Sequence, residues 1–397
     1  MKEKNRIEVV QCFMDGSLTV TEASRVLERS TRQIYRLQSR FREFGIEGLI
    51  HGNKGRPSPL KVDNQLRWRI RALASGRYKD VNDTHMSELL KRKEGIDVSR
   101  QWLRQELRSA GIGPKRRRRG RKYRSKRERK EAFGMMLQID ASEHDWLEGR
   151  GSKLVLVGAK DDATGYLWCR FVDSESTWSY MGLMEEIFES HGLPSSLYSD
   201  RHTIFHSPRD ATIVEQLQNK RPLTQFGRAM DELGINIIKA YSAPAKGRIE
   251  RVFGFLQDRL VVEMRLRGVK TKEQANEVLD WFVAEHNKRF TVLPRQKEFI
   301  FRKAPSKYIR QRILCLKEQR IVGNDHTISF GGLILQIPPG KKFHSIAKQV
   351  VTVMQMPDGS VEIAYKKTPV ARFGKDAIAR IIKNAKQQLN EELKMAA

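Results

Sequence analysis

Apolar side chains recur at helical spacing at the start of the chain. Ile7, Val10 and Met14 lie three or four positions apart, and Gly16 interrupts the series. The pattern predicts a first helix that ends before Gly16.

Two further helices are predicted by capping boxes, in which a hydroxyl side chain precedes Glu or Gln by three positions. Thr19 stands in this relation to Glu22, and Ser30 to Gln33. Three short helices in a row favour a helix-turn-helix domain over residues 1–50, whose last helix would enter the major groove. A plain three-helix bundle with solvated arginines is the alternative. The side chains that we predict to bind DNA from the last helix are Arg32, Gln33, Arg36 and Arg40.

A second helical region follows a short linker. Residues 51–62 are rich in Gly, Pro and basic side chains and predict the linker. Residues 63–113 return to helical periodicity, with Ser99 in a capping position before Trp102. We interpret this stretch as a second helix-turn-helix-like domain, although a helical spacer would give the same spacing.

The pattern changes from helical to strand-like after residue 132. Short apolar runs predict a three-stranded meander, and the segments after it alternate between helix and strand. This order is that of the ribonuclease-H-like fold, so we predict an α/β core over residues 132–268. The predicted strands lie at 135–139, 154–157, 166–172, 196–199 and 235–240, and the helices at 178–189, 226–233 and about 247–266.

The last third of the chain combines helical and strand-like segments. Residues 269–317 predict a helical connector, and residues 318–373 alternate like strands, with turns at Gly331-Gly332 and Asp358-Gly359. That composition suits a small β-barrel, followed by a helical tail at 374–397. The predicted fold class is therefore multidomain α+β.

The charge balance points to a polyanionic partner. The 397 residues contain 75 Lys and Arg against 47 Asp and Glu, a net charge of +28. Residues 1–130 hold 35 basic and 15 acidic side chains, so +20 of this charge lies in the first third. The densest part is a basic linker at 114–131, which we expect to contact DNA phosphates through Arg116, Arg117, Arg118 and Arg119.

Other classes of protein find little support. The three cysteines, Cys12, Cys169 and Cys315, lie far apart and predict neither a disulfide framework nor a zinc site. No apolar run approaches the roughly 18 residues of a membrane span. We expect a cytoplasmic protein with no membrane partner.

Three acidic residues lie where the predicted core would gather them. Asp140 ends the first strand, Asp200 follows the fourth, and Glu250 lies in the first turns of the long helix. Converging carboxylates repel one another unless cations neutralise them, and ligands that are all oxygen select Mg²⁺ or Mn²⁺. We predict that these residues bind two such ions and catalyse phosphodiester transfer.

Basic and polar residues flank two of these acids. His202 follows Asp200 closely and could support the active site, or be an ordinary loop residue. Lys246 and Arg248 precede Glu250, and we predict that both contact DNA.

These motifs resemble the DDE transposases of bacterial insertion sequences, in particular the ISNCY type, within the retroviral-integrase superfamily. The similarity runs from about Arg6 to Arg372. It implies an integrase-type core in which Asp140, Asp200 and Glu250 bind the metals, and a nucleoid-associated protein. The segments that carry it are LQIDAS from Leu137, SDRHTIF from Ser199, LTQFGRAMDELGI from Leu223, AKGRIERVFGFLQDRL from Ala245 and HNKRFTVLPR from His286.

Two departures from the family pattern concern the approach to Glu250. The family more often has Ser-Pro-Gln-Ala-Lys-Gly-Arg where this chain reads SAPAKGR from Ser242, and 49 residues separate Asp200 from Glu250, more than in integrases. The additional segment, 207–221, could touch DNA or be a simple insertion.

The predicted function is that of a transposase that binds the terminal inverted repeats of its element, cleaves their ends and joins them to target DNA. Two ends must be processed together, so we expect a dimer or larger assembly on double-stranded DNA. The alternatives are a sequence-specific DNA-binding regulator or domesticated inactive relative, and a nuclease without strand transfer.

Overall fold

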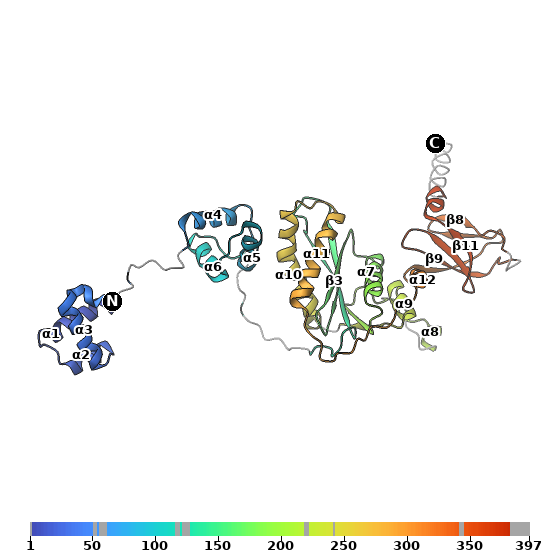
Figure 1. Ribbon diagram of the computed structural model, residues 1–397. Coiled ribbons are helices and arrows are strands. Elements are labelled where there is room, and N and C mark those ends of the chain that lie inside the picture. The colour runs from blue at the N-terminus through green and yellow to red at the C-terminus, as the bar shows by residue number, and fades with distance from the viewer. Residues whose placement is uncertain are drawn as a thin grey trace. The chain divides into compact units, whose positions relative to one another are not determined.

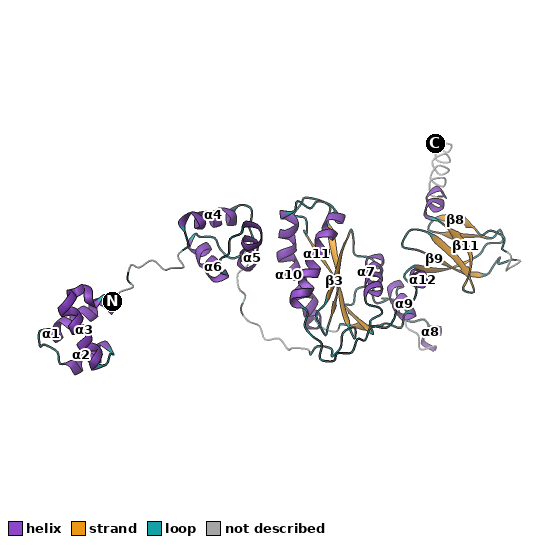
Figure 2. Ribbon diagram, in the orientation of Figure 1, coloured by secondary structure: helices purple, strands orange, loops and turns teal. Residues whose placement is uncertain are grey.

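The computed structural model describes residues 2–50, 54, 62–115, 120, 128–217, 222–240, 243–340 and 345–381. The chain divides into two compact units, Met1–Ala72 and Leu73–Ala397, and each is described by itself. Figure 1 labels their helices and strands, and Figure 2 colours them by type.

The first unit contains the three predicted helices. Both capping boxes form: the Thr19 N–H donates to Glu22 Oε2 at 2.7 Å, and the Ser30–Gln33 pair does the same before the third helix. Val9, Ala23 and Ile34 are buried together, one from each helix. The elements are α1 (Lys2–Met14), α2 (Val20–Leu27), α3 (Thr31–Phe44) and the 3₁₀ turn η1 (Gly45–Leu49).

Three helices lie in the region of the second predicted domain. They are α4 (Asn64–Ser75), α5 (Asp83–Glu94) and α6 (Arg100–Ser109). Ser99 caps α6 as predicted, since its hydroxyl accepts the Trp102 N–H at 3.2 Å. That these helices form a DNA-binding domain stays a prediction.

A five-stranded sheet forms the centre of the second unit, with the strand order β3-β2-β1-β4-β5. Strands β1, β2 and β3 are antiparallel, whereas β4 is parallel to both β1 and β5. This is the ribonuclease-H-like order that the sequence predicted. The strands are β1 (Leu137–His144), β2 (Leu154–Asp161), β3 (Leu167–Val172), β4 (Ser196–Ser199) and β5 (Asn236–Lys239).

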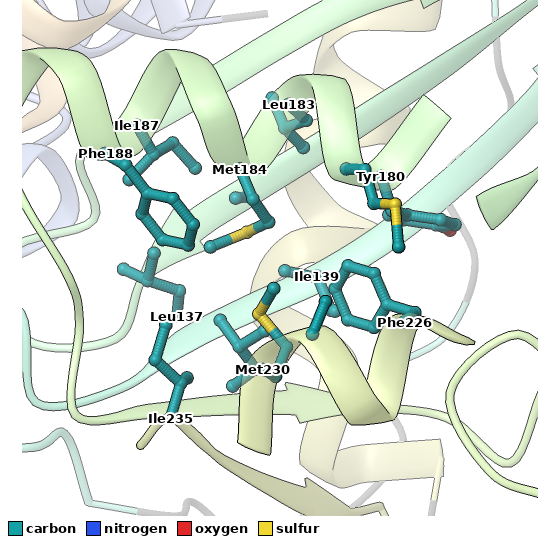
Figure 3. Packing of buried hydrophobic residues seen from close by; sticks show 14 of the residues in the cluster. Leu137, Ile139, Tyr180, Leu183, Met184, Ile187, Phe188, Phe226, Met230 and Ile235 are labelled. Atoms are coloured by element: carbon teal, nitrogen blue, oxygen red, sulfur yellow. The ribbon is translucent and has the colours of Figure 1, made fainter. Parts of the chain in front are cut away.

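Helices cover both faces of this sheet (Figure 1). On one face Leu137 and Ile139 of β1 pack with side chains of α7 and α9, including Met184 and Met230 (Figure 3). The other face packs against α10 and α11. The helices are α7 (Thr177–Ser190), α8 (Ile213–Leu217), α9 (Gln225–Glu232), α10 (Ala243–Leu266) and α11 (Lys272–Phe290).

Helix α5 is joined to α10 by charged groups. Glu263 of α10 is only 1% exposed and lies 3.1 Å from the His85 ring, and it also accepts from Arg92. Arg259 of α10 donates to Glu88 at 2.6 Å. Both contacts are made by Oε1 of Glu263, so groups of α5 compensate the charge of the buried carboxylate.

The predicted C-terminal barrel is wrong as a closed structure. Residues 316–373 form a four-stranded antiparallel sheet, β11-β10-β9-β6, and a separate hairpin, β7-β8. In the described part of the chain no strand joins β11 to β6. The hairpin together with Ile378 and Ile381 covers the apolar face instead, so strand pairing is not needed to bury it. The remaining elements are α12 (Lys307–Ile313), β6 (Leu316–Ile321), β7 (Thr327–Phe330), β8 (Leu333–Gln336), β9 (Val350–Gln355), β10 (Val361–Tyr365) and β11 (Thr368–Phe373).

Across the described ranges, none of the helices combines the length and the apolar character that crossing a membrane requires.

Candidate active site and nucleic-acid interface

Two of the predicted acids occupy matching positions on neighbouring strands. The parallel pairing of β1 with β4 sets Leu137 opposite Leu197, and Asp140 and Asp200 each lie three residues further along. Adjacent strands are about 4.8 Å apart. The register therefore sets Asp140, in the middle of β1, level with Asp200, which directly follows β4.

The phenol of Tyr180 lies within electrostatic reach of both acids. Burial raises the pKa of Tyr180, and the negative charges of Glu175, Asp140 and Asp200 raise it further. Its hydroxyl donates to Glu175 at 2.7 Å, so the phenol stays protonated beside the acid pair. Nothing in the sequence pattern marks Tyr180 as a neighbour of the acids, because it also belongs to the buried apolar cluster.

Asp140 belongs to the face of the sheet that α10 covers. Its cross-strand partner on β2 is Gly158. A Cβ at Gly158 would lie 3.0 Å from Cys169 Sγ and 3.0 Å from Cε1 of the Phe253 ring. Phe253 belongs to α10. Because cross-strand partners share a face, Asp140 points to the side of α10.

Side-chain contacts align α10 with β1. Near the start of the helix Arg248 pairs with Asp162, which also accepts from Gln138 of β1 at 2.8 Å. Further along, Gln257 Nε2 donates to Ser142 Oγ at 3.0 Å. The helix and the strand therefore run in the same direction over this length.

Glu250 lies on α10 between these two contacts. Its side chain is exposed, whereas the adjacent Ile249 is fully buried. This position is level with the part of β1 that carries Asp140. Within the described ranges no group of three or more His, Cys, Asp or Glu side chains is close enough to hold a metal ion, so convergence of the three acids stays a prediction.

The loop after Asp200 contains two histidines. The backbone N–H of His202 donates to Asp200 Oδ1 at 3.0 Å, and the His202 side chain is exposed. His206, which the sequence reading missed, lies 3.2 Å from Ser199 Oγ through its Nε2. Burial lowers the pKa of His206, Lys239 lowers it further, and Asp200 acts in the opposite direction.

Of the residues predicted to contact DNA around α10 and in the basic linker, the structure describes the side chain of Arg248. The guanidinium of Arg248 pairs with the buried Asp162 carboxylate, and its side chain is 19% exposed. The side chain of Lys246 and the residues Arg116–Arg119 lie outside the described part of the chain. Their roles stay predictions.

The predicted recognition helix lines a groove in the first unit. Arg32, Gln33, Arg36 and Arg40 are exposed on α3 and border a groove of about 1120 Å³. Arg6 and Arg29 add charge from neighbouring segments. A basic groove along one helix is the expected surface for a DNA backbone.

Comparison with known proteins finds one matching domain family and two sequence relatives. Residues 5–58 match a helix-turn-helix domain family. A protein of Sinorhizobium fredii (strain NBRC 101917 / NGR234) that carries the name transposase y4bF is 36% identical over 380 residues, covering 94% of this chain and 82% of its own length. The transposase for insertion sequence IS1202 of Streptococcus pneumoniae is 29% identical over 403 residues, covering 91% and 84%.

Among solved structures, the crystal structure of the catalytic core domain of BIV integrase aligns with a TM-score of 0.29 and 16% identity. The alignment covers 40% of this chain and 88% of that one.

Proposed function

This chain belongs to the transposases, and on that premise we propose that it binds the terminal repeats of its element, cleaves the DNA ends and joins them to target DNA. The observation that supports the chemical part is the matching register of Asp140 and Asp200 on the neighbouring strands β1 and β4. That Glu250 of α10 joins them is part of the proposal.

The donor set suits a hard divalent cation. Asp140, Asp200 and Glu250 offer only carboxylate oxygens, the ligands preferred by Mg²⁺ and Mn²⁺. In this proposal Asp140, Asp200 and Glu250 would together hold the ions. Ions bound there would activate a water or a 3′-hydroxyl and stabilise the leaving oxygen at the scissile phosphate.

The protein groups around the acids hold that arrangement in place. The Asp200 carboxylate is oriented by the backbone N–H of His202. The Gln257–Ser142 hydrogen bond fixes the helix that carries Glu250 against β1. Tyr180 belongs to the buried apolar cluster on the α7 face, and a low-polarity neighbourhood of this kind strengthens electrostatic interactions.

DNA recognition is assigned to α3. Its exposed Arg32, Gln33, Arg36 and Arg40 would read the terminal repeats, while basic residues elsewhere would contact phosphates. Because two element ends must be cut and joined, we propose that a dimer or larger assembly forms on DNA.

The test is incubation of the full chain with Mg²⁺ and DNA that carries its own element ends, beside an Asp200→Asn variant. Cleavage and joining by the wild type, with neither in the variant, supports the proposal. Cleavage without joining would instead identify a nuclease. DNA binding without either reaction would identify a regulator or an inactive relative.

A further inference from the structure

A lysine in the sheet lies among cations close to Glu250. Lys160 of β2 is opposite Gln138 of β1 and Leu167 of β3, and even-numbered residues of β2 face α10 and α11. Its side chain is half-buried. Burial and, to a smaller extent, the charges of Arg129, Arg251 and Arg248 together lower the pKa of Lys160 to about 8.

Three segments around Lys160 add positive or neutral groups. Arg248 and Arg251 come from α10, and Arg129 comes from the segment before β1. From α11 comes His286, whose pKa is lowered to about 4 by burial, with a further contribution from Lys160. The imidazole is therefore neutral at pH 7.

The nearby acids already have partners. Asp162 accepts from Arg248, Gln138 and a backbone N–H, and Asp161 accepts from Thr164 and the Gly134 N–H. In the ranges that the structure describes, no carboxylate lies within ion-pair distance of Lys160 Nζ. The cluster of Lys160, Arg129, Arg248 and Arg251 thus contains four cations, of which Arg248 is paired with Asp162.

Such a cluster costs stability in the isolated protein. Partial burial disfavours the ammonium, and repulsion from three guanidinium groups disfavours it again. An apolar residue of the same length would fill the position without either cost. Charge that is kept at this cost is typical of a site for an anion.

The surroundings of the cluster give a phosphate access to it. Arg251 is exposed and adjacent to Glu250. On the same helix, a Cβ at Gly247 or Gly254 would meet no atom within 4 Å. A nucleic-acid backbone can therefore approach this face of α10 closely.

We infer that Lys160, with Arg129 and Arg251, is a binding site for one backbone phosphate of the DNA strand that reaches Glu250, while Arg248 is held by Asp162. This inference rests on the proposed function, because the phosphate belongs to the DNA substrate. Lys160 is thereby a positioning residue: it holds the strand and does not touch the reacting atoms.

The experiment uses the full chain and duplex DNA with an element end. Lys160→Met keeps the length of the side chain and removes its charge, and Lys153→Met, at an exposed position just before β2, is the matched control. The expected result is a plot of log affinity against log salt whose slope is smaller by about 1 for Lys160→Met and unchanged for Lys153→Met.

Thermal unfolding without DNA separates this role from a structural one. Removing an unfavourable cation should raise the Tm of Lys160→Met by about 1–3 °C. A lower Tm with an unchanged salt slope would assign Lys160 to the core and overturn the inference. Arg251→Gln, at an exposed position, supplies a second variant, and its slope change should be less than additive with that of Lys160→Met.

The two proposals can fail separately. If the wild type neither binds nor cleaves the element ends, the proposed function falls. If the wild type binds and cleaves the element ends, but Lys160→Met and Lys153→Met have the same salt slope and the same Tm, only the proposed phosphate site is contradicted.

Discussion

The amide of Gln257 donates to the hydroxyl of Ser142, and this 3.0 Å hydrogen bond ties α10 to β1 two residues beyond Asp140. It is a side-chain link between the helix that carries Glu250 and the strand that carries Asp140. The distance between the two acids therefore depends on a contact that takes no part in the chemistry.

Replacing Gln257 with Leu should slow DNA cleavage more than it weakens the fold. Loss of one hydrogen bond costs about 1 kcal/mol of stability, whereas misplacing a catalytic group by about 1 Å can cost roughly 100-fold in rate. We expect a cleavage rate lower by about 10-fold or more and unchanged DNA affinity. Ser142→Ala should reproduce the defect, and the double variant should be no worse than either alone; additive losses would contradict a shared role.

Divalent metal should stabilise the protein through the acid pair. At a Mg²⁺ or Mn²⁺ concentration about ten times Kd, binding to the native state adds about 1.4 kcal/mol, or about 2–4 °C in Tm. Asp140→Asn should lose this shift in a thermal unfolding assay. Asp231→Asn, which removes an exposed carboxylate on α9, should keep it. An equal shift in all three proteins would place the metal elsewhere.

Substituting an arginine of α3 should show whether that residue contacts a DNA base or a backbone phosphate. Arg36→Ala is expected to weaken binding to the element end by about 5- to 150-fold if Arg36 contacts a base, and to reduce the preference over a scrambled duplex. If it contacts a phosphate, both duplexes should weaken together with a smaller salt slope. Arg42 is exposed on α3 but outside the groove, so Arg42→Ala is the control. Unchanged binding by Arg36→Ala would remove this residue from the interface.

The ion pairs between α5 and α10 should make the free energy of unfolding depend on pH in the acid range. Burial acts to raise the pKa of Glu263, but hydrogen bonds from His85 and Arg92 outweigh it and lower the pKa to about 2. A carboxyl whose pKa falls from 4.5 to about 2 on folding contributes roughly 3 kcal/mol above pH 4.5, and this is lost as pH falls through 2.

Glu263→Gln should therefore have a lower Tm than the wild type at pH 7, and the difference should shrink between pH 4.5 and pH 2. Glu277→Gln, an exposed position on α11, should follow the wild type throughout. A difference in Tm that does not depend on pH would show that packing, and not charge, accounts for the effect.

Local chemistry made most of the elements predictable. The Thr19–Glu22 and Ser30–Gln33 capping boxes mark helix starts that the structure confirms, because a cap depends on residues three positions apart. The turns at Gly331-Gly332 and Asp358-Gly359 also lie between paired strands. The first strand was predicted too early, at 135–139, because its second half carries polar residues such as Asp140 and Ser142 that face α10.

Contacts between segments far apart in the sequence were harder to predict. The alignment of Asp140 with Asp200 depends on the register of two strands 60 positions apart, and composition does not encode that register. The barrel was wrong because alternation predicts strands but not whether the first and last of them pair. Lys160 reads as an ordinary strand residue, and only its neighbours from α10 and α11 reveal the cation cluster.

Gly158 has no functional group, yet the absence of its side chain determines how closely α10 packs on β2. A methyl group there would press on Phe253 and Cys169 and force α10 or β2 to yield by a few tenths of an ångström. Metal-assisted catalysis accepts errors of only about 0.5 Å in its ligands. Under the proposed function, the space left by the missing side chain on β2 is therefore as necessary for catalysis as the carboxylates, and a substitution at Gly158 would inactivate the protein without changing any reacting group.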